Sequence, residues 1–132
     1  MNSWESQQAF WSGFGVPAFE ATTTIDKKTM ESMGLPEFPQ LTYQSFSGSI
    51  GQEATLNASL WYRSESWAEI KSKADEIKRA LTPRALTAID GGYMWMHTPT
   101  FLPFAQPLDA GAEDEKIKRI VLTVEAESLT AN

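Results

Sequence analysis

Hydrophobic and polar residues alternate most regularly between residues 54 and 62. The apolar positions in this stretch are Leu56, Ala58, Leu60 and Tyr62. A period of two is typical of a strand with one buried face. After residues 63–65 the apolar spacing becomes helical, with Trp67, Ile70, Ala74, Ile77 and Leu81 on one face. The pattern therefore predicts a strand, a tight bend and an amphipathic helix, around which the rest of the chain is organised.

Both ends of this helix carry sequence signals. Ser66 and Glu69 have the spacing of a capping box, in which the hydroxyl accepts from a backbone N–H and the carboxylate bonds back. The helix is therefore predicted to open at Ser66. It is predicted to stop at Thr82-Pro83, because a proline disfavours helical backbone in the residue before it.

Two further elements are predicted in the N-terminal part. Residues 3–12 have the composition of a short helix that Ser3 caps. Residues 40–47 carry large β-forming side chains and predict a first strand. The glycine-containing run at residues 48–51 predicts a hairpin connection from this strand to the next.

The C-terminal part predicts two more strands. A turn signal, Asp90-Gly91-Gly92, precedes a strand over residues 93–97 that has large side chains on both faces. Such a strand is either central in its sheet or has one face in an interface. Residues 116–126 predict a closing strand, with Ile120, Leu122 and Val124 on one side.

Two long segments lack a regular pattern. Residues 13–39 contain several prolines and predict an irregular arm, with one turn of helix from Asp26 to Met33. Residues 98–115 predict a long loop. Its three prolines argue against a regular strand interior. Connections this long are often functional or become ordered on assembly, although for the N-terminal arm the pattern slightly favours packing against the same chain.

The predicted order is α-β-β-α-β-β. It indicates one domain over residues 1–132, of the α+β class, with a mostly antiparallel sheet and helices packed on one face. No apolar run reaches the roughly 20 residues that span a bilayer, so no membrane association is expected. The N-terminus does not have the pattern of a signal peptide.

Composition and charge exclude some classes of function. The chain has no cysteine, which excludes disulfides, thiolate nucleophiles and cysteine-ligated zinc. Its formal net charge of −6 argues against nucleic-acid binding through a general basic surface. Five tryptophans and seven phenylalanines are many for 132 residues, and they indicate either core packing or a subunit interface.

No constellation of residues indicates catalysis or metal binding. His97 is the single histidine, and a lone histidine is more typical of a hydrogen-bonded strand residue than of an active site. The acids Asp109, Glu113, Asp114 and Glu115 lack the spacing of a calcium loop. The glycines do not form a phosphate-binding loop. We therefore predict no catalytic, cofactor-binding or metal-ligating residue, and a protein that is not an enzyme.

One family resemblance rests on the order and character of these segments. They are a proline-bounded first strand, then LNASLWYRSESWAEIKSKADEIKRAL, GGYMWMHTPTFLPFAQPLD and a closing KIKRIVLTVEAESL. Over roughly residues 35–127 the chain resembles the small tail-terminator or tail-completion proteins of long-tailed bacteriophages. In that family an aromatic-ended strand runs through a bend into an amphipathic helix, and a late strand closes the sheet after a long loop.

The resemblance implies a structural protein of the virion tail, assembled in the cytoplasm of the host bacterium. Copies of the chain would form a ring, expected to be a hexamer, at the head-proximal end of the tail tube. Its partners would be the major tail-tube protein and the head–tail connector. Genomic DNA would pass through the ring without sequence-specific binding.

The resemblance also implies roles for two groups of residues. Phe101, Leu102 and Phe104 become candidates for a subunit or partner interface. Glu113, Asp114 and Glu115 become candidates for the channel wall, where negative charge repels DNA phosphates and keeps the DNA mobile.

Two other classes remain open. Another minor virion protein, such as a head–tail connector component, would share the size, the acidity and the missing active site. A non-viral α+β domain that binds a small molecule would need a pocket with convergent polar groups, which the sequence does not indicate.

Overall fold

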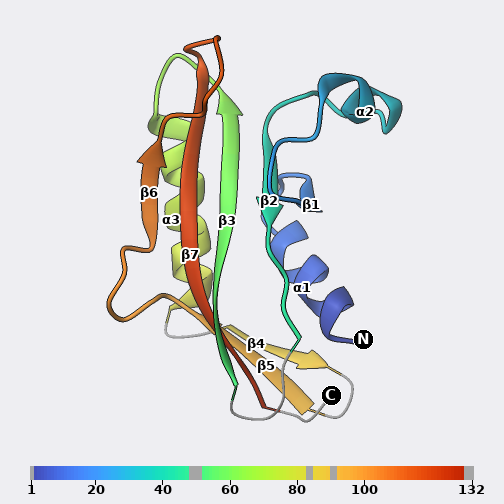
Figure 1. The fold of residues 1–132 in the computed structure, drawn as a ribbon, viewed down its shortest axis with the longest axis vertical. Coiled ribbons are helices and arrows are strands. Elements are labelled where there is room, and N and C mark those ends of the chain that lie inside the picture. The colour runs from blue at the N-terminus through green and yellow to red at the C-terminus, as the bar shows by residue number, and fades with distance from the viewer. Residues whose placement is uncertain (1, 48–51, 83–84, 90–91, 130–132) are drawn as a thin grey trace.

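Three helices and seven strands are formed by the residues that the computed structural model describes, which are 2–47, 52–82, 85–89 and 92–129 (Figure 1). The helices are α1 (Ser3–Ser12), α2 (Lys27–Ser32) and α3 (Ala68–Leu81). The strands are β1 (Ala18–Glu20), β2 (Gln40–Tyr43), β3 (Glu53–Arg63), β4 (Ala85–Ile89), β5 (Gly92–His97), β6 (Ala105–Leu108) and β7 (Ile117–Ser128). The predicted α+β class is confirmed. None of the helices in this part of the chain is long and apolar enough to cross a membrane.

Strand β7 lies at the centre of one sheet with the order β1-β2-β3-β7-β5-β4. It pairs along its whole length with β3, from Glu53 opposite Glu127 to Arg63 opposite Ile117. Its other edge is shared, because β6 pairs with residues 119–122 and β5 with residues 125–128. All pairs are antiparallel except β1 with β2. The sheet is therefore mostly antiparallel, as predicted.

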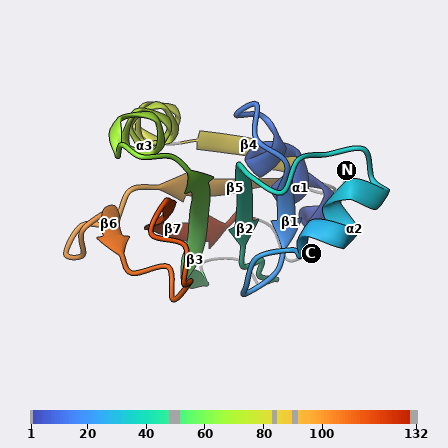
Figure 2. The same cartoon turned by 90° about the horizontal axis from the view of Figure 1, so that it is seen from above.

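One face of this sheet carries the hydrophobic core. The predicted alternation is confirmed in β3 and β7, whose buried apolar side chains are Leu56, Ala58, Leu60, Tyr62, Ile120, Leu122, Val124 and Ala126. Helices α1 and α3 both lie over this face (Figure 2), and α3 contributes Ile70, Ala74, Ile77 and Leu81. Burial of one such large aliphatic side chain stabilises the fold by about 1.5–3 kcal/mol. Helix α2 instead lies beyond the β1 edge (Figure 2).

Two glutamine side chains, one buried and one exposed, fasten α1 to the edge of the sheet. Gln7 is fully buried, and its amide both donates to and accepts from the backbone of Phe46. Gln8 donates to the carbonyl of Ala18 and accepts from the Tyr43 hydroxyl. Burial, with the nearby Glu20 carboxylate as a smaller cause, raises the pKa of Tyr43, which keeps this hydroxyl a donor. The helix is thus joined to β1, to β2 and to the chain that directly follows β2.

Both predicted helix caps are wrong by one or two residues. Helix α3 begins at Ala68 rather than Ser66, and no side chain caps it at Trp67. The Ser66 hydroxyl instead accepts from the N–H of Ala68 in a local turn, and this competes with a capping box. In α1 the capping box uses Asn2 with Glu5 rather than Ser3. The predicted end of α3 is confirmed, since it stops at Leu81.

Within the predicted irregular arm over residues 13–39, the strand β1 was not predicted, whereas the predicted turn of helix after Asp26 is confirmed as α2. This segment contains β1 and α2, and Asp26 caps α2 as the sequence indicated. The ordering comes from Gln40, which is fully buried in β2. Its amide bonds the N–H and carbonyl of Ile25 and the carbonyl of Glu37, so a side chain from the sheet holds the segment on both sides of α2.

The prediction of a long loop over residues 98–115 is wrong in its middle part. Residues 105–108 form β6, with Pro107 opposite Ile120. A proline is tolerated there because β6 has no second strand partner among the described residues, so its missing N–H costs no ladder bond. The predicted first strand is also too long, since β2 ends at Tyr43, and β4 was not predicted as a separate strand. The predicted connection at residues 48–51, Pro83, and Asp90 and Gly91 of the predicted turn lie outside the described residues.

Candidate functional site

The segment between β5 and β6 presents Phe101, the most exposed large apolar side chain of the described chain, beside a second exposed one. Phe101 is 94% exposed and Leu102 is 52% exposed. Exposure of large apolar groups in neighbouring positions is typical of surfaces that a partner covers. Leu108 adds a third exposed apolar side chain on β6. We call the loop side chains Phe101 and Leu102 the apolar loop surface.

Phe104 differs from the other two predicted interface residues. Its side chain is half-buried and packs against the hydrophobic core. Its carbonyl accepts a short bond of 2.7 Å from the N–H of Thr123 in β7. Phe104 therefore anchors the loop to the sheet, whereas Phe101 and Leu102 project from that anchor.

The three predicted channel acids also divide. Glu113 and Glu115 are exposed. The Asp114 carboxylate accepts from the backbone N–H of Lys116 at 2.9 Å and from Arg63 Nε at 2.8 Å. These bonds, the backbone one first, hold the pKa of Asp114 below its ordinary value. Asp114 therefore holds the turn that precedes β7, and only Glu113 and Glu115 keep the character of free surface acids.

His97 sits at the end of β5 as a hydrogen-bonded strand residue. Its Nδ1 lies 2.9 Å from the carbonyl oxygen of Thr98 and 3.9 Å from a carboxylate oxygen of Glu125 on β7. Within the described ranges, three or more histidine or carboxylate side chains nowhere come together as a metal site would need. We assign no catalytic role to His97.

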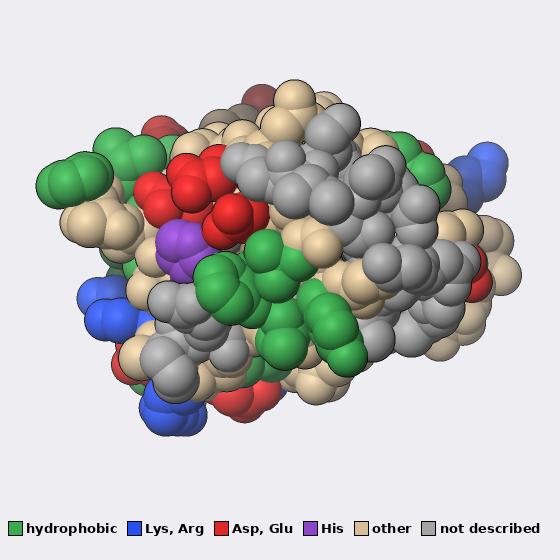
Figure 3. All heavy atoms as spheres, turned by 90° about the horizontal axis from the view of Figure 1, so that it is seen from below, with side chains coloured by type: hydrophobic (Ala, Val, Ile, Leu, Met, Phe, Trp, Pro, Cys, Tyr) green, Lys and Arg blue, Asp and Glu red, His purple; other side chains and the backbone are tan. Residues whose placement is uncertain are grey.

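A second apolar group, which the sequence reasoning did not single out, lies on the outer face of β4 and β5. Leu86 and Tyr93 are each at least half exposed, and Leu86 pairs with Trp95. Figure 3 shows hydrophobic side chains gathered on this side of the molecule, with carboxylates and a histidine beside them. The sequence signal was the bulk on both faces of residues 93–97. The structure confirms one reading of it, because β5 lies between β7 and β4.

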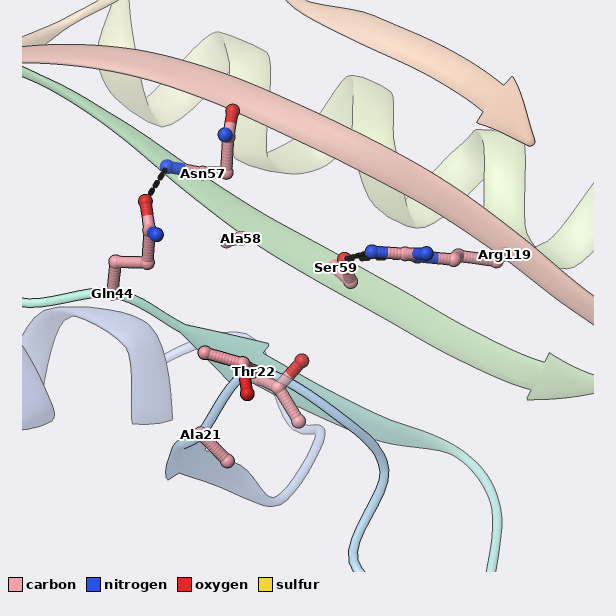
Figure 4. Close-up of a pocket in the computed structure, with 8 residues that line it drawn as sticks. Ala21, Thr22, Gln44, Asn57, Ala58, Ser59 and Arg119 are labelled. Carbon is pink, nitrogen blue, oxygen red and sulfur yellow. Dashed lines mark hydrogen bonds between the residues drawn. The ribbon is translucent and has the colours of Figure 1, made fainter. Parts of the chain in front are cut away.

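A half-open polar hollow of about 150 Å³ lies on the outer face of the sheet, between the chain after β1 and strands β2 and β3 (Figure 4). Its polar lining residues are Thr22, Thr42, Gln44, Asn57, Ser59 and Arg119. The sequence placed Arg119 on the face of β7 opposite Ile120 but gave no sign of this hollow. The hollow depends on the position of the chain around Thr22, which only the fold reveals.

Comparisons of the chain with protein-family models, with curated proteins and with solved structures find no match.

Proposed function

We propose that this chain is a structural protein of a bacteriophage tail, a tail terminator or tail-completion protein that forms a ring at the head-proximal end of the tail tube. The observation that carries the proposal is the apolar loop surface, in which a nearly fully exposed Phe101 projects from a loop that Phe104 fastens to the core. An exposed phenylalanine held at a fixed place is suited to anchor a protein interface.

The arrangement of the elements supports a ring. The loop that leads into β6 and the helices α1 and α2 lie toward opposite ends of the sheet, as counted along its strand order (Figure 1). If the loop of one copy contacts the α1 side of the next, the two surfaces differ, and such head-to-tail contacts form a ring when the rotation between copies closes. One face of the ring would bind the tube subunit. The other face would have no surface on which a further tube subunit could add.

The order of elements also agrees with what the resemblance implies. Strand β3 carries Trp61 and Tyr62 just before its last residue, Arg63, and the chain bends through residues 64–67 into the amphipathic α3. The late strand β7 then pairs with β3 after the segment that carries the apolar loop surface.

Replacement of Phe101 by serine tests the proposal. The variant is expected to fold normally, because the Phe101 side chain is almost fully exposed and contributes almost no buried area. It is expected to block tail assembly. The measurement is complementation of a phage that lacks this gene, followed by electron microscopy of the particles. Phe101→Leu is the matched control, since it keeps an apolar anchor and should restore assembly.

The particles also separate the two virion roles. Loss of a terminator leaves tube growth unchecked and gives overlong tails, whereas loss of a connector component gives filled heads beside tails of normal length. Normal particles from Phe101→Ser would contradict the interface assignment. If sequencing of the DNA around the gene shows metabolic neighbours rather than tail-tube and tape-measure genes, the virion proposal fails altogether.

The polar hollow is the observation that favours the non-viral alternative, a small-molecule binding domain. Its size argues against that role, because sites for cofactors and drug-sized ligands usually have about 300–1,000 Å³ and this hollow has about 150 Å³.

A further inference from the structure

We infer that the polar hollow on the outer face of the sheet is a binding site for one carboxylate group, with Arg119 as its cationic residue. The inference is independent of the proposed tail function. It rests on the bonds that the lining side chains make and on those that they leave unmade.

Arg119 is held in place before any ligand binds. Its Nε and Nη2 donate to the Ser59 hydroxyl at 3.2 and 3.1 Å, and its guanidinium lies 4.6 Å from the centre of the Trp61 ring. Stacking on an aromatic ring and a fixed pair of bonds reduce the entropy that the side chain loses on binding. Figure 4 shows the Arg119 side chain reaching from β7 to Ser59 on the neighbouring strand β3.

This arginine has no acidic partner in the described structure, because no carboxylate lies within ion-pair distance of it. The chain contains 17 aspartates and glutamates, and its other described ion pairs use Lys27, Arg63, Lys73, His97 and Lys116. Nη1 also makes no hydrogen bond within that part of the chain. A partly buried guanidinium therefore has donors left for an anion from outside.

The neighbouring polar groups use their oxygens as acceptors. Thr42 Oγ1 accepts from the indole N–H of Trp61 at 3.0 Å, and Gln44 Oε1 accepts from the backbone N–H of Asn57 at 2.8 Å. The Ser59 hydroxyl accepts from Arg119. Each of these partners is only a donor, so the direction of the three bonds is fixed by chemistry.

What remains at the hollow is a set of donors. The Thr42 and Ser59 hydroxyl hydrogens and the Gln44 amide N–H₂ donate to no other group of the described chain. They join the guanidinium around the same space, which Thr22 borders from the chain after β1 (Figure 4). A site rich in donors with one fixed cation selects an oxyanion over a neutral or cationic group.

The size of the hollow selects a small group. A water molecule takes about 30 Å³ of liquid volume, so the hollow has room for roughly five waters. This accommodates an acetate ion or the end of an aspartate or glutamate side chain, but not a nucleotide. The carboxylate comes either from a free organic acid or from an acidic side chain of another protein chain.

The test is titration of the folded protein with sodium acetate, replacing chloride at constant ionic strength, followed by NMR. The indole N–H of Trp61 reports on the site because it bonds Thr42. We expect its resonance to shift and saturate at millimolar acetate, an affinity near −4 kcal/mol. A parallel titration with N-acetylglutamate amide distinguishes the sources. Saturation by both ligands indicates a site for a protein side chain, and saturation by acetate alone indicates one for a free acid.

Three variants make the test specific. Arg119→Gln should weaken acetate binding at least tenfold, and Arg119→Lys should weaken it less, because lysine keeps the charge but loses the planar fork. Thr22→Val alters the rim without touching the core and should also weaken binding. Arg63→Gln is the matched control and should bind as the original chain does. A shift that never saturates, or that is equally strong in Arg119→Gln, overturns the inference.

Discussion

Single polar side chains of this protein link segments that are far apart in the sequence through hydrogen bonds. Asp114 joins the end of β3 to the start of β7 through Arg63 and the backbone of Lys116. Gln7, Gln8 and Gln40 join helices or turns to strands in the same way. Sequence patterns predict none of these bonds, because a polar residue at a surface and one at a buried junction look alike in a single sequence.

The Asp114 carboxylate predicts a change of stability at acid pH. Its pKa is lowered in the folded protein, so the carboxylate stabilises the fold above its ordinary pKa of 3.8, and this contribution is lost as pH falls through the lower folded value. Asp114→Asn should therefore flatten the fall of Tm between about pH 5 and pH 2. Thermal unfolding across this range measures it. Glu113→Gln is the control, since no described group bonds Glu113, and an equal flattening there would refute the assignment.

Two substitutions of Trp11 are predicted to lower the free energy of unfolding by unequal amounts. It is buried and stacked on Tyr43, but its indole Nε1 has no hydrogen-bond partner within the described residues. An unpartnered buried donor costs about 1–3 kcal/mol, so its removal offsets part of the lost packing. Trp11→Phe should lower the free energy of unfolding by only about 1 kcal/mol, against about 3–5 kcal/mol for Trp11→Ala. Urea unfolding compares the two, and equal losses would mean that the indole N–H is satisfied.

Among the helices and strands, the sequence correctly predicted those with a clear hydrophobic periodicity. The apolar faces of β3, α3 and β7 were predicted correctly, because burial of a whole face imposes a period on the sequence. β1, β4 and β6 were not predicted as strands, since strands of three to five residues carry too few periods to be recognised. The proline at position 107 also argued against a strand. It is tolerated because β6 lies at an edge beside β7, and the local sequence does not reveal that position.

Because Gln40 holds the 13–39 segment in place, its substitution is predicted to destabilise that segment locally. Gln40→Leu keeps the volume but leaves one N–H and two carbonyls of Ile25 and Glu37 without their partner, which should cost about 2–3 kcal/mol. Hydrogen exchange of the amides around α2 should increase before that of β3 and β7. The matched control is Gln106→Leu on the exposed strand β6, which should leave exchange unchanged. Uniform loss of protection in both variants would contradict a local role.

For the whole molecule, the candidate site was predicted in part. The sequence drew attention to Phe101 and Leu102, and the structure places both at the surface. It did not separate them from Phe104, because whether an aromatic side chain projects or packs depends on the path of the loop. The hollow beside Arg119 was missed, because its walls come from four separate segments of the chain.

If the chain has the tail function proposed above, charge reversal in the acidic segment before β7 is predicted to affect DNA passage but not folding. Glu113→Lys with Glu115→Lys reverses two exposed charges but keeps Asp114, which the turn needs. The doubly substituted protein should keep its Tm within about 1 °C, since surface charges contribute little to stability. Phage that carry it should eject DNA more slowly, as measured by the rate of DNA release from purified particles. Unchanged release would place these acids away from the channel.

Strand β7 is central in the sheet but follows all its partners in the chain. During translation, β3 and α3 therefore leave the ribosome before the strand that completes their sheet, and their apolar faces stay uncovered until residues 117–128 emerge. Pairing so distant in sequence is slow, and exposed strand edges invite aggregation meanwhile. A nascent chain arrested before β7 should therefore remain sensitive to protease and bind chaperones, whereas one extended past it should become resistant.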